Sequence, residues 1–138
     1  MRSRILLTTC VLVGVFAAAA VATSGDGGGQ TRQWAVVYLA EPTLIGSTIV
    51  QGPVLFTHDD ARMAGGEACT TVQLFEPAGG PTEEIASFHC IPVSRNVVHK
   101  FTLRTRPNTE MGLGCVLTEY QFAGDNEGHG VPQSTNAH

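Results

Sequence analysis

Short apolar runs separated by glycine- and proline-containing breaks make up most of the chain after residue 33. The runs span 34–40, 43–45, 46–50, 54–57, 69–75, 85–91, 97–104 and 115–122. They are four to eight residues long for the most part and rich in Val, Ile, Thr and Phe, which is typical of β-strands. The periodicity of a long amphipathic helix is missing from the sequence. The pattern therefore predicts an all-β domain, an antiparallel β-sandwich or barrel of about seven short strands.

The breaks between the runs have the composition of turns. Glu41-Pro42 is expected to end the first strand, and Gln51-Gly52-Pro53 is expected to form a turn. His58-Asp59-Asp60 is expected to open a short polar or helical turn that continues through Ala64 and ends at Gly65-Gly66. The carboxylates of Asp59 and Asp60 suit such a turn because they accept hydrogen bonds from free backbone N–H groups.

The first 22 residues have the order of a secretory signal, here a signal helix. Arg2 and Arg4 precede an uncharged, mostly apolar segment, and Ala20-Val21-Ala22 places small residues where a signal peptidase cleaves. The alternative is an uncleaved membrane anchor, although an apolar run of about 18 residues is at the lower limit for spanning a bilayer. We expect the protein to be secreted or periplasmic, with membrane contact only through an uncleaved signal segment.

The rest of the chain is expected to hold one domain. Residues 1–22 are the signal peptide, and 23–32 form a flexible linker. Residues 33–124 form the β-sandwich domain, and 125–138 form a polar, glycine-rich C-terminal tail.

Residues 42–56 read PTLIGSTIVQGPVLF. This stretch resembles a hairpin pattern found in an uncharacterised group of small secreted bacterial β-rich proteins with no assigned function. The resemblance implies an all-β exported domain, and it carries over no catalytic or binding residue.

The charge of the chain bears on its partners. Eight basic and twelve acidic residues give a net charge of −4, and loss of the two signal arginines deepens it to −6. An acidic domain without a run of Lys or Arg is not expected to bind nucleic acid or an anionic membrane surface. The expected partner is a protein or a small ligand of unknown identity.

Cleavage of the signal also changes the cysteine count. Cys10 leaves with the signal, so the exported protein keeps Cys69, Cys90 and Cys115. In an oxidising compartment two of these three are expected to form a disulfide, and the sequence does not choose the pair. The remaining thiol is buried, pairs between chains or binds metal.

A metal site is the most specific chemistry that the composition allows. Histidine and cysteine together suit zinc or copper, and Met63 or Met111 would complete a copper site. No metal-binding spacing such as Cys-x-x-Cys is present. His89 and Cys90 are neighbours, so on a strand they point to opposite faces unless the strand bends or ends there. The candidate metal ligands are His58, Asp59, His89, Cys90, Cys115 and His129.

Enzyme signatures are missing from the sequence, which leaves catalysis uncertain and disfavoured. His99 is expected to be a core histidine, with Glu119 as its partner. Three functions follow: a non-catalytic binding or structural module, a periplasmic metal-binding protein, and a small hydrolase built around His58-Asp59-Asp60.

Overall fold

The described part of the chain is mostly β-strand. A computed structural model describes residues 32–133. In chain order the elements are β1 (Arg32–Ile45), β2 (Thr48–Asp59), α1 (Asp60–Ala64), β3 (Thr70–Glu76), β4 (Gly80–Phe88), β5 (Ile91–Ser94), β6 (Thr102–Pro107), β7 (Cys115–Gln121) and β8 (Glu127–Gly130). The predicted signal peptide, almost all of the predicted linker and the end of the predicted tail lie outside the described residues. Within residues 32–133 no helix has the length and apolar character needed to cross a membrane.

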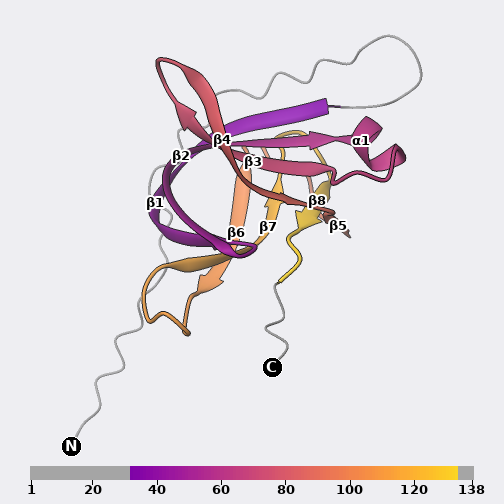
Figure 1. The fold of residues 1–138 in the computed structure, drawn as a ribbon. Coiled ribbons are helices and arrows are strands. Elements are labelled where there is room, and N and C mark those ends of the chain that lie inside the picture. Colours follow the sequence, from indigo (N-terminus) through magenta and orange to yellow (C-terminus); the bar gives the residue numbers. More distant parts are fainter. Residues whose placement is uncertain (1–31, 134–138) are drawn as a thin grey trace, which may run out of the picture.

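The strands form one curled, mixed sheet (Figure 1). Their hydrogen-bonded order is β4-β3-β2-β1-β7-β8-β5, and β6 pairs with β7 beside this path. The predicted all-β class is confirmed. The sheet is not purely antiparallel, because β1 and β7 pair in parallel at Thr43 with Cys115 and at Leu44 with Val116. It is a single curled sheet of eight strands, where the sequence predicted an antiparallel sandwich or barrel of about seven.

The first two strands form a long hairpin with an irregularity in the middle. Pro42 does not end β1, because the pairing with β2 shifts register between Leu39 and Thr43 and then continues. A bulge tolerates proline, which has no N–H to donate to the ladder. The predicted turn at Gln51-Gly52-Pro53 is also wrong: Gly52 pairs with Leu39, and its φ of +96° suits glycine.

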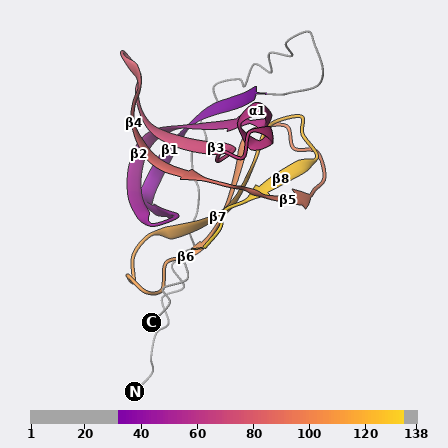
Figure 2. The same cartoon turned by 45° about the vertical axis from the view of Figure 1, so that its right-hand side comes forward.

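The two ends of the sheet are joined directly in sequence. β4 and β5 lie at opposite ends of the strand order, yet only His89 and Cys90 separate them along the chain. Figure 2 shows the chain running straight from β4 into β5. The curl of the sheet therefore brings its two edges together at this short link, and Cys90 lies at the junction.

An aromatic cluster forms the centre of the core. Phe56, Phe101, Tyr120 and Phe122 are nearly inaccessible, and their neighbouring ring centroids lie 5.2–6.1 Å apart. Buried aliphatic residues surround them, chiefly Ala35, Val37, Leu39, Ile45, Val54, Val72 and Leu117. Burial of this apolar surface is the main force that stabilises the curled sheet.

The strand predicted at 97–104 begins later than expected, at Thr102. Phe101 and Leu103 are buried as their alternation predicted, but the pattern does not extend back to His99, which is exposed. The prediction of His99 as a core histidine is therefore wrong, because the residues before Phe101 form a loop and not a strand.

Glu119 has a different partner from the one expected. Its carboxylate lies 3.1 Å from Arg95 Nε and 3.0 Å from Arg104 NH1. Glu119 is buried, and a buried carboxylate requires such pairing. The sequence suggested an imidazole partner, whereas two guanidinium groups neutralise this carboxylate.

A last strand forms inside the predicted C-terminal tail. β8 lies between β7 and β5, so residues 127–130 belong to the sheet and not to a polar tail. Its glycines look like loop residues in the sequence but lie where other parts of the chain approach the backbone closely. A Cβ at Gly128 would lie 2.5 Å from Glu119 Oε1, and one at Gly130 would lie 3.1 Å from the carbonyl oxygen of Ile91. β8 places His129 in the interior.

Candidate metal centre

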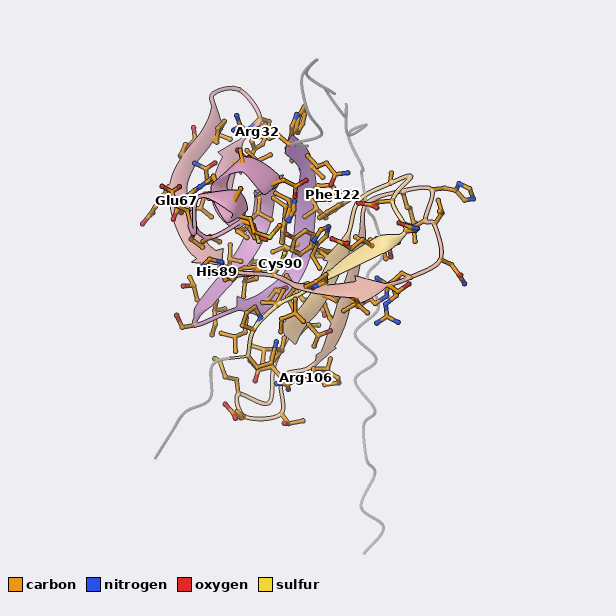
Figure 3. All side chains as sticks on the ribbon, turned by 90° about the vertical axis from the view of Figure 1, so that its right-hand side faces the viewer. Arg32, Glu67, His89, Cys90, Arg106 and Phe122 are labelled. Atoms are coloured by element: carbon orange, nitrogen blue, oxygen red, sulfur yellow. The ribbon has the colours of Figure 1, made fainter. Side chains whose placement is uncertain are left out.

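Four cysteine and histidine side chains meet where the two edges of the sheet come together. His58 ends the inward face of β2, Cys69 directly precedes β3, Cys90 lies in the β4–β5 link and His129 lies on β8. Figure 3 shows Cys90 near the middle of the molecule, where the N-terminal strands approach β8. We call these four residues the Cys2His2 cluster.

Strand alternation places His58 in this cluster. Val54, Phe56 and His58 occupy successive inward positions of β2, and all three are buried. The next residue, Asp59, points the other way, and its carboxylate accepts a 2.9 Å hydrogen bond from the amide of Ala61. Asp59 is thus the N-cap of α1, and the predicted helical turn is confirmed.

The two sulfur atoms are in contact. Cys69 Sγ lies 3.0 Å from Cys90 Sγ, and the backbone amide of Cys90 donates a 3.2 Å hydrogen bond to Cys69 Sγ. Both cysteines are free thiols. Their separation is well beyond the roughly 2.05 Å of a disulfide, so the predicted disulfide is not formed by this pair. The antiparallel pairing of β3 with β4, which sets Thr70 opposite Phe88, brings the two thiols together just beyond that pair.

His129 completes the cluster from β8, the strand next to the far edge of the sheet. It pairs with Tyr120 across β7 and β8, and the two rings stack with centroids 4.9 Å apart and an interplanar angle of 19°. The side chain is 1% exposed, and its Nε2 has no hydrogen-bond partner among the described residues. Its Nδ1 lies 3.5 Å from Cys90 Sγ and 3.8 Å from Glu127 Oε1. Buried imidazole nitrogens are normally satisfied; the unpartnered nitrogen here is Nε2, whereas the one that faces Cys90 is Nδ1.

The distances from the two imidazoles to Cys90 match those of a metal site. His58 Nε2 lies 3.4 Å from Cys90 Sγ, and His129 Nδ1 lies 3.5 Å from the same sulfur. Two ligands of a tetrahedral zinc, with Zn–S of about 2.3 Å and Zn–N of about 2.05 Å, are separated by about 3.5 Å. The donor atoms of His58, Cys69 and Cys90 all lie within 4.8 Å of one another. The donor atoms of these three residues are therefore spaced to share one ion, and His129 Nδ1 lies beside one of them, Cys90 Sγ.

A carboxylate orients one of the two histidines, His58, from outside the cluster. Asp60 Oδ1 lies 3.5 Å from His58 Nδ1, which leaves Nε2 directed at the sulfurs. Carboxylate partners of this kind fix the tautomer and the direction of metal-binding imidazoles. Glu127 Oε1 lies 3.8 Å from His129 Nδ1, the same nitrogen that faces Cys90 Sγ, so it is not placed to orient that imidazole in this way.

A pocket gives access to this side of the cluster. It has a volume of about 550 Å³ and is lined by both histidines of the cluster and by the acidic residues Asp60, Asp125 and Glu127. Negative charge around an opening attracts cations. A metal ion would therefore reach the cluster through an acidic entrance.

Burial keeps the ion-free cluster uncharged at Cys90 and His129. Burial, reinforced by the neighbouring Cys69, raises the pKa of the Cys90 thiol to about 12. Burial, reinforced by the charge of His58, lowers the pKa of His129 to about 4. A neutral imidazole is the form that binds metal, and a bound cation would favour the thiolate over the thiol.

The lowered pKa of His129 predicts acid sensitivity of the metal-free protein. The pKa of a histidine in an unfolded chain is about 6.5, whereas the pKa of His129 in the folded protein is about 4. Between these two pH values the unfolded state binds a proton at His129 and the folded state does not, so acid favours unfolding. The stability present above pH 6.5 should fall by about 3 kcal/mol as the pH drops through this window. Urea unfolding in chelator at pH 7 and pH 4.5 measures it. The variant His129→Phe keeps the aromatic stack and should lose less stability between these two pH values. An equal loss in the parent protein and in this variant would contradict the assignment of the acid sensitivity to His129.

The structure brings together only part of the predicted ligand set. His58, Cys90 and His129 lie in the cluster. His89 is exposed and lies outside it, although it is next to Cys90 in sequence. Cys115 lies at the start of β7, with its sulfur 3.1 Å from Glu41 Oε2.

The sequence did not predict two of the residues that form the site. Cys69 was singled out only as a disulfide candidate, and its role follows from the pairing of His58 with Thr70, one residue further along. Tyr120 also belongs to the site, because its hydroxyl hydrogen-bonds Thr70 and its ring stacks on His129. Its sequence context indicates only an apolar strand, which does not predict this role.

No protein-family model matches the chain, and no curated protein or solved structure is significantly similar to it. The geometry of the cluster and the chemistry of its donors are thus the basis for assigning a function.

Proposed function

We propose that the protein is an exported, non-catalytic zinc-binding domain. The Cys2His2 cluster holds the ion. The observation that carries the proposal is the convergence of two imidazole nitrogens on Cys90 Sγ, at 3.4 and 3.5 Å, with Cys69 Sγ beside it. Export is inferred from the signal-like sequence of residues 1–22.

The donor set favours zinc over copper. Two sulfurs and two imidazoles in a tetrahedral arrangement are typical of zinc, whereas a copper electron-transfer site combines two histidines and one cysteine with a weak axial methionine. Met63 and Met111, the two methionines that the sequence offered for copper, are 50% and 56% exposed. The fourth donor here is the second cysteine.

Four protein ligands favour a stabilising role over a catalytic one. Catalytic zinc sites use three protein ligands and leave a position for water, whereas sites with four protein ligands are closed. The ligands come from β2, the start of β3, the β4–β5 link and β8. A bound ion would therefore fasten the two edges of the curled sheet, and the stabilised domain would present its surface to a partner.

Asp60 provides a test of the orienting carboxylate. Asp60→Asn removes the charged partner of His58 Nδ1, so zinc affinity should fall by about 10- to 100-fold, as it does when outer partners of metal ligands are lost. Competition with a chromophoric chelator measures this affinity. The matched control Glu67→Gln removes the same charge from a carboxylate that pairs with Arg62, and should leave affinity unchanged. Equal affinity in both variants would contradict the role of Asp60.

Metal analysis tests the function itself. Protein purified without chelators and offered zinc and copper together should retain one zinc per chain. A preference for copper would overturn the assignment of the metal, and failure to retain either ion would overturn the proposed function. Turnover of a substrate by the zinc-loaded protein would overturn its non-catalytic character.

A further inference from the structure

The separation of the two sulfurs does not match a zinc site as closely as the histidine distances do. Two thiolates on one tetrahedral zinc lie about 3.8 Å apart, and two sulfurs in a disulfide lie about 2.05 Å apart. Cys69 Sγ and Cys90 Sγ are 3.0 Å apart, between these two values. The free thiols are thus placed so that a small displacement leads to either state.

We infer that Cys69 and Cys90 form a redox switch: oxidation joins them in a disulfide and releases the zinc ion. The inference rests on the proposed function, because it concerns the regulation of that same site. A disulfide sulfur carries no negative charge, and zinc binds cysteine only as the thiolate. Oxidation therefore removes two of the four ligands at once, and the two remaining histidines hold zinc weakly.

The two thiols differ in exposure, and this difference sets the order of reaction. Cys69 is 1% exposed, whereas Cys90 is half-buried in the β4–β5 link. An external reagent therefore reaches Cys90 first. Cys69 then lies in contact with the sulfur that has reacted, and the backbone amide of Cys90 already holds it there.

The oxidant belongs to the class of low-molecular-weight disulfides. Cys90 sulfur, as the thiolate, attacks one sulfur of the oxidant, which breaks the S–S bond and releases one thiolate of the reagent. Cys69 thiolate then attacks Cys90 sulfur, forms the Cys69–Cys90 bond and expels the second thiolate. Two electrons pass from the cysteines to the oxidant. Each released thiolate takes up one proton, supplied by the cysteine thiols in the metal-free protein and by solvent when zinc had displaced those protons.

The switch preserves the connection between the start of β3 and the β4–β5 link. In the zinc form, the ion links the start of β3 to the β4–β5 link; in the oxidised form, a covalent bond links the same two places. The oxidised protein should therefore remain folded after losing its metal. Cys115 lies with Glu41 at the start of β7, outside this exchange.

Oxidised glutathione added to the purified, zinc-loaded protein tests the switch. A zinc-sensitive dye should report one ion released per Cys69–Cys90 disulfide, located by peptide mapping under non-reducing conditions, and dithiothreitol should restore zinc binding. Cys69→Ser, which leaves Cys90 without its partner, should instead accumulate one glutathione on Cys90. The control Cys115→Ser should release zinc and form the disulfide like the parent protein.

Two results overturn the inference and are distinguishable. Zinc that stays bound while no Cys69–Cys90 disulfide forms overturns the switch and leaves the proposed function standing. Reduced protein that takes up no zinc before any oxidant is added overturns the proposed function, and the regulation falls with it.

Discussion

Removal of zinc from the reduced protein is expected to lower its free energy of unfolding by about 4 kcal/mol. This value compares the metal-free protein with protein in a free zinc concentration about a thousandfold above the dissociation constant. An ion that binds only the folded chain stabilises it by mass action, and the four ligands exist as one site only after the sheet has curled. For a domain of about 100 residues this loss corresponds to a fall in Tm of roughly 15–30 °C.

Thermal unfolding with and without a chelator measures this effect. The reduced protein should be used, since a Cys69–Cys90 disulfide would hide the loss. The His58→Ala variant, which lacks a ligand, serves as the control, and chelator should change its Tm much less. An unchanged Tm of the parent protein in chelator would show that no ion stabilises this fold.

Cys90→Ser is expected to reduce zinc affinity by more than the roughly 10- to 100-fold that loss of an outer partner costs. Cys90 is the centre of the cluster: its sulfur contacts Cys69 Sγ, His58 Nε2 and His129 Nδ1. Serine keeps the size of the side chain close to that of cysteine but gives zinc a hydroxyl that stays protonated and binds poorly. Competition with a chelator of known affinity measures the difference.

Cys115→Ser is the matched control for Cys90→Ser, because it is the same substitution at a cysteine outside the cluster. It should bind zinc as the parent does. If Cys90→Ser retained the parent affinity, or if the Cys115 variant lost as much as the Cys90 variant, the ligand set proposed here would be wrong.

Local patterns in the sequence predict the strands well but not the way the sheet closes. Alternation along residues 54–58 follows from the side-chain period of a strand, and it places His58 on the buried face. Local signals do not report the parallel pairing of β1 with β7, which joins residues more than seventy positions apart, such as Leu44 and Val116. That pairing joins the strands of the N-terminal half to those of the C-terminal half.

The candidate site, like the fold, could be predicted only in part from the sequence. His58, Cys90 and His129 could be singled out by residue type alone. Their meeting could not, because it depends on both edges of the sheet arriving at the β4–β5 link. His129 was assigned to a polar tail, since the flanking Gly128 and Gly130 resemble loop residues. Those glycines instead lie where β8 packs closely against Glu119 and Ile91.

The ligand shell of the bound ion is the most direct test of the Cys2His2 cluster. X-ray absorption at the zinc edge of the reduced, zinc-loaded protein should show two sulfurs at about 2.3 Å and two nitrogens at about 2.0–2.1 Å. The donors would be those of His58, Cys69, Cys90 and His129. A shell made only of oxygen and nitrogen, without sulfur, would contradict the account.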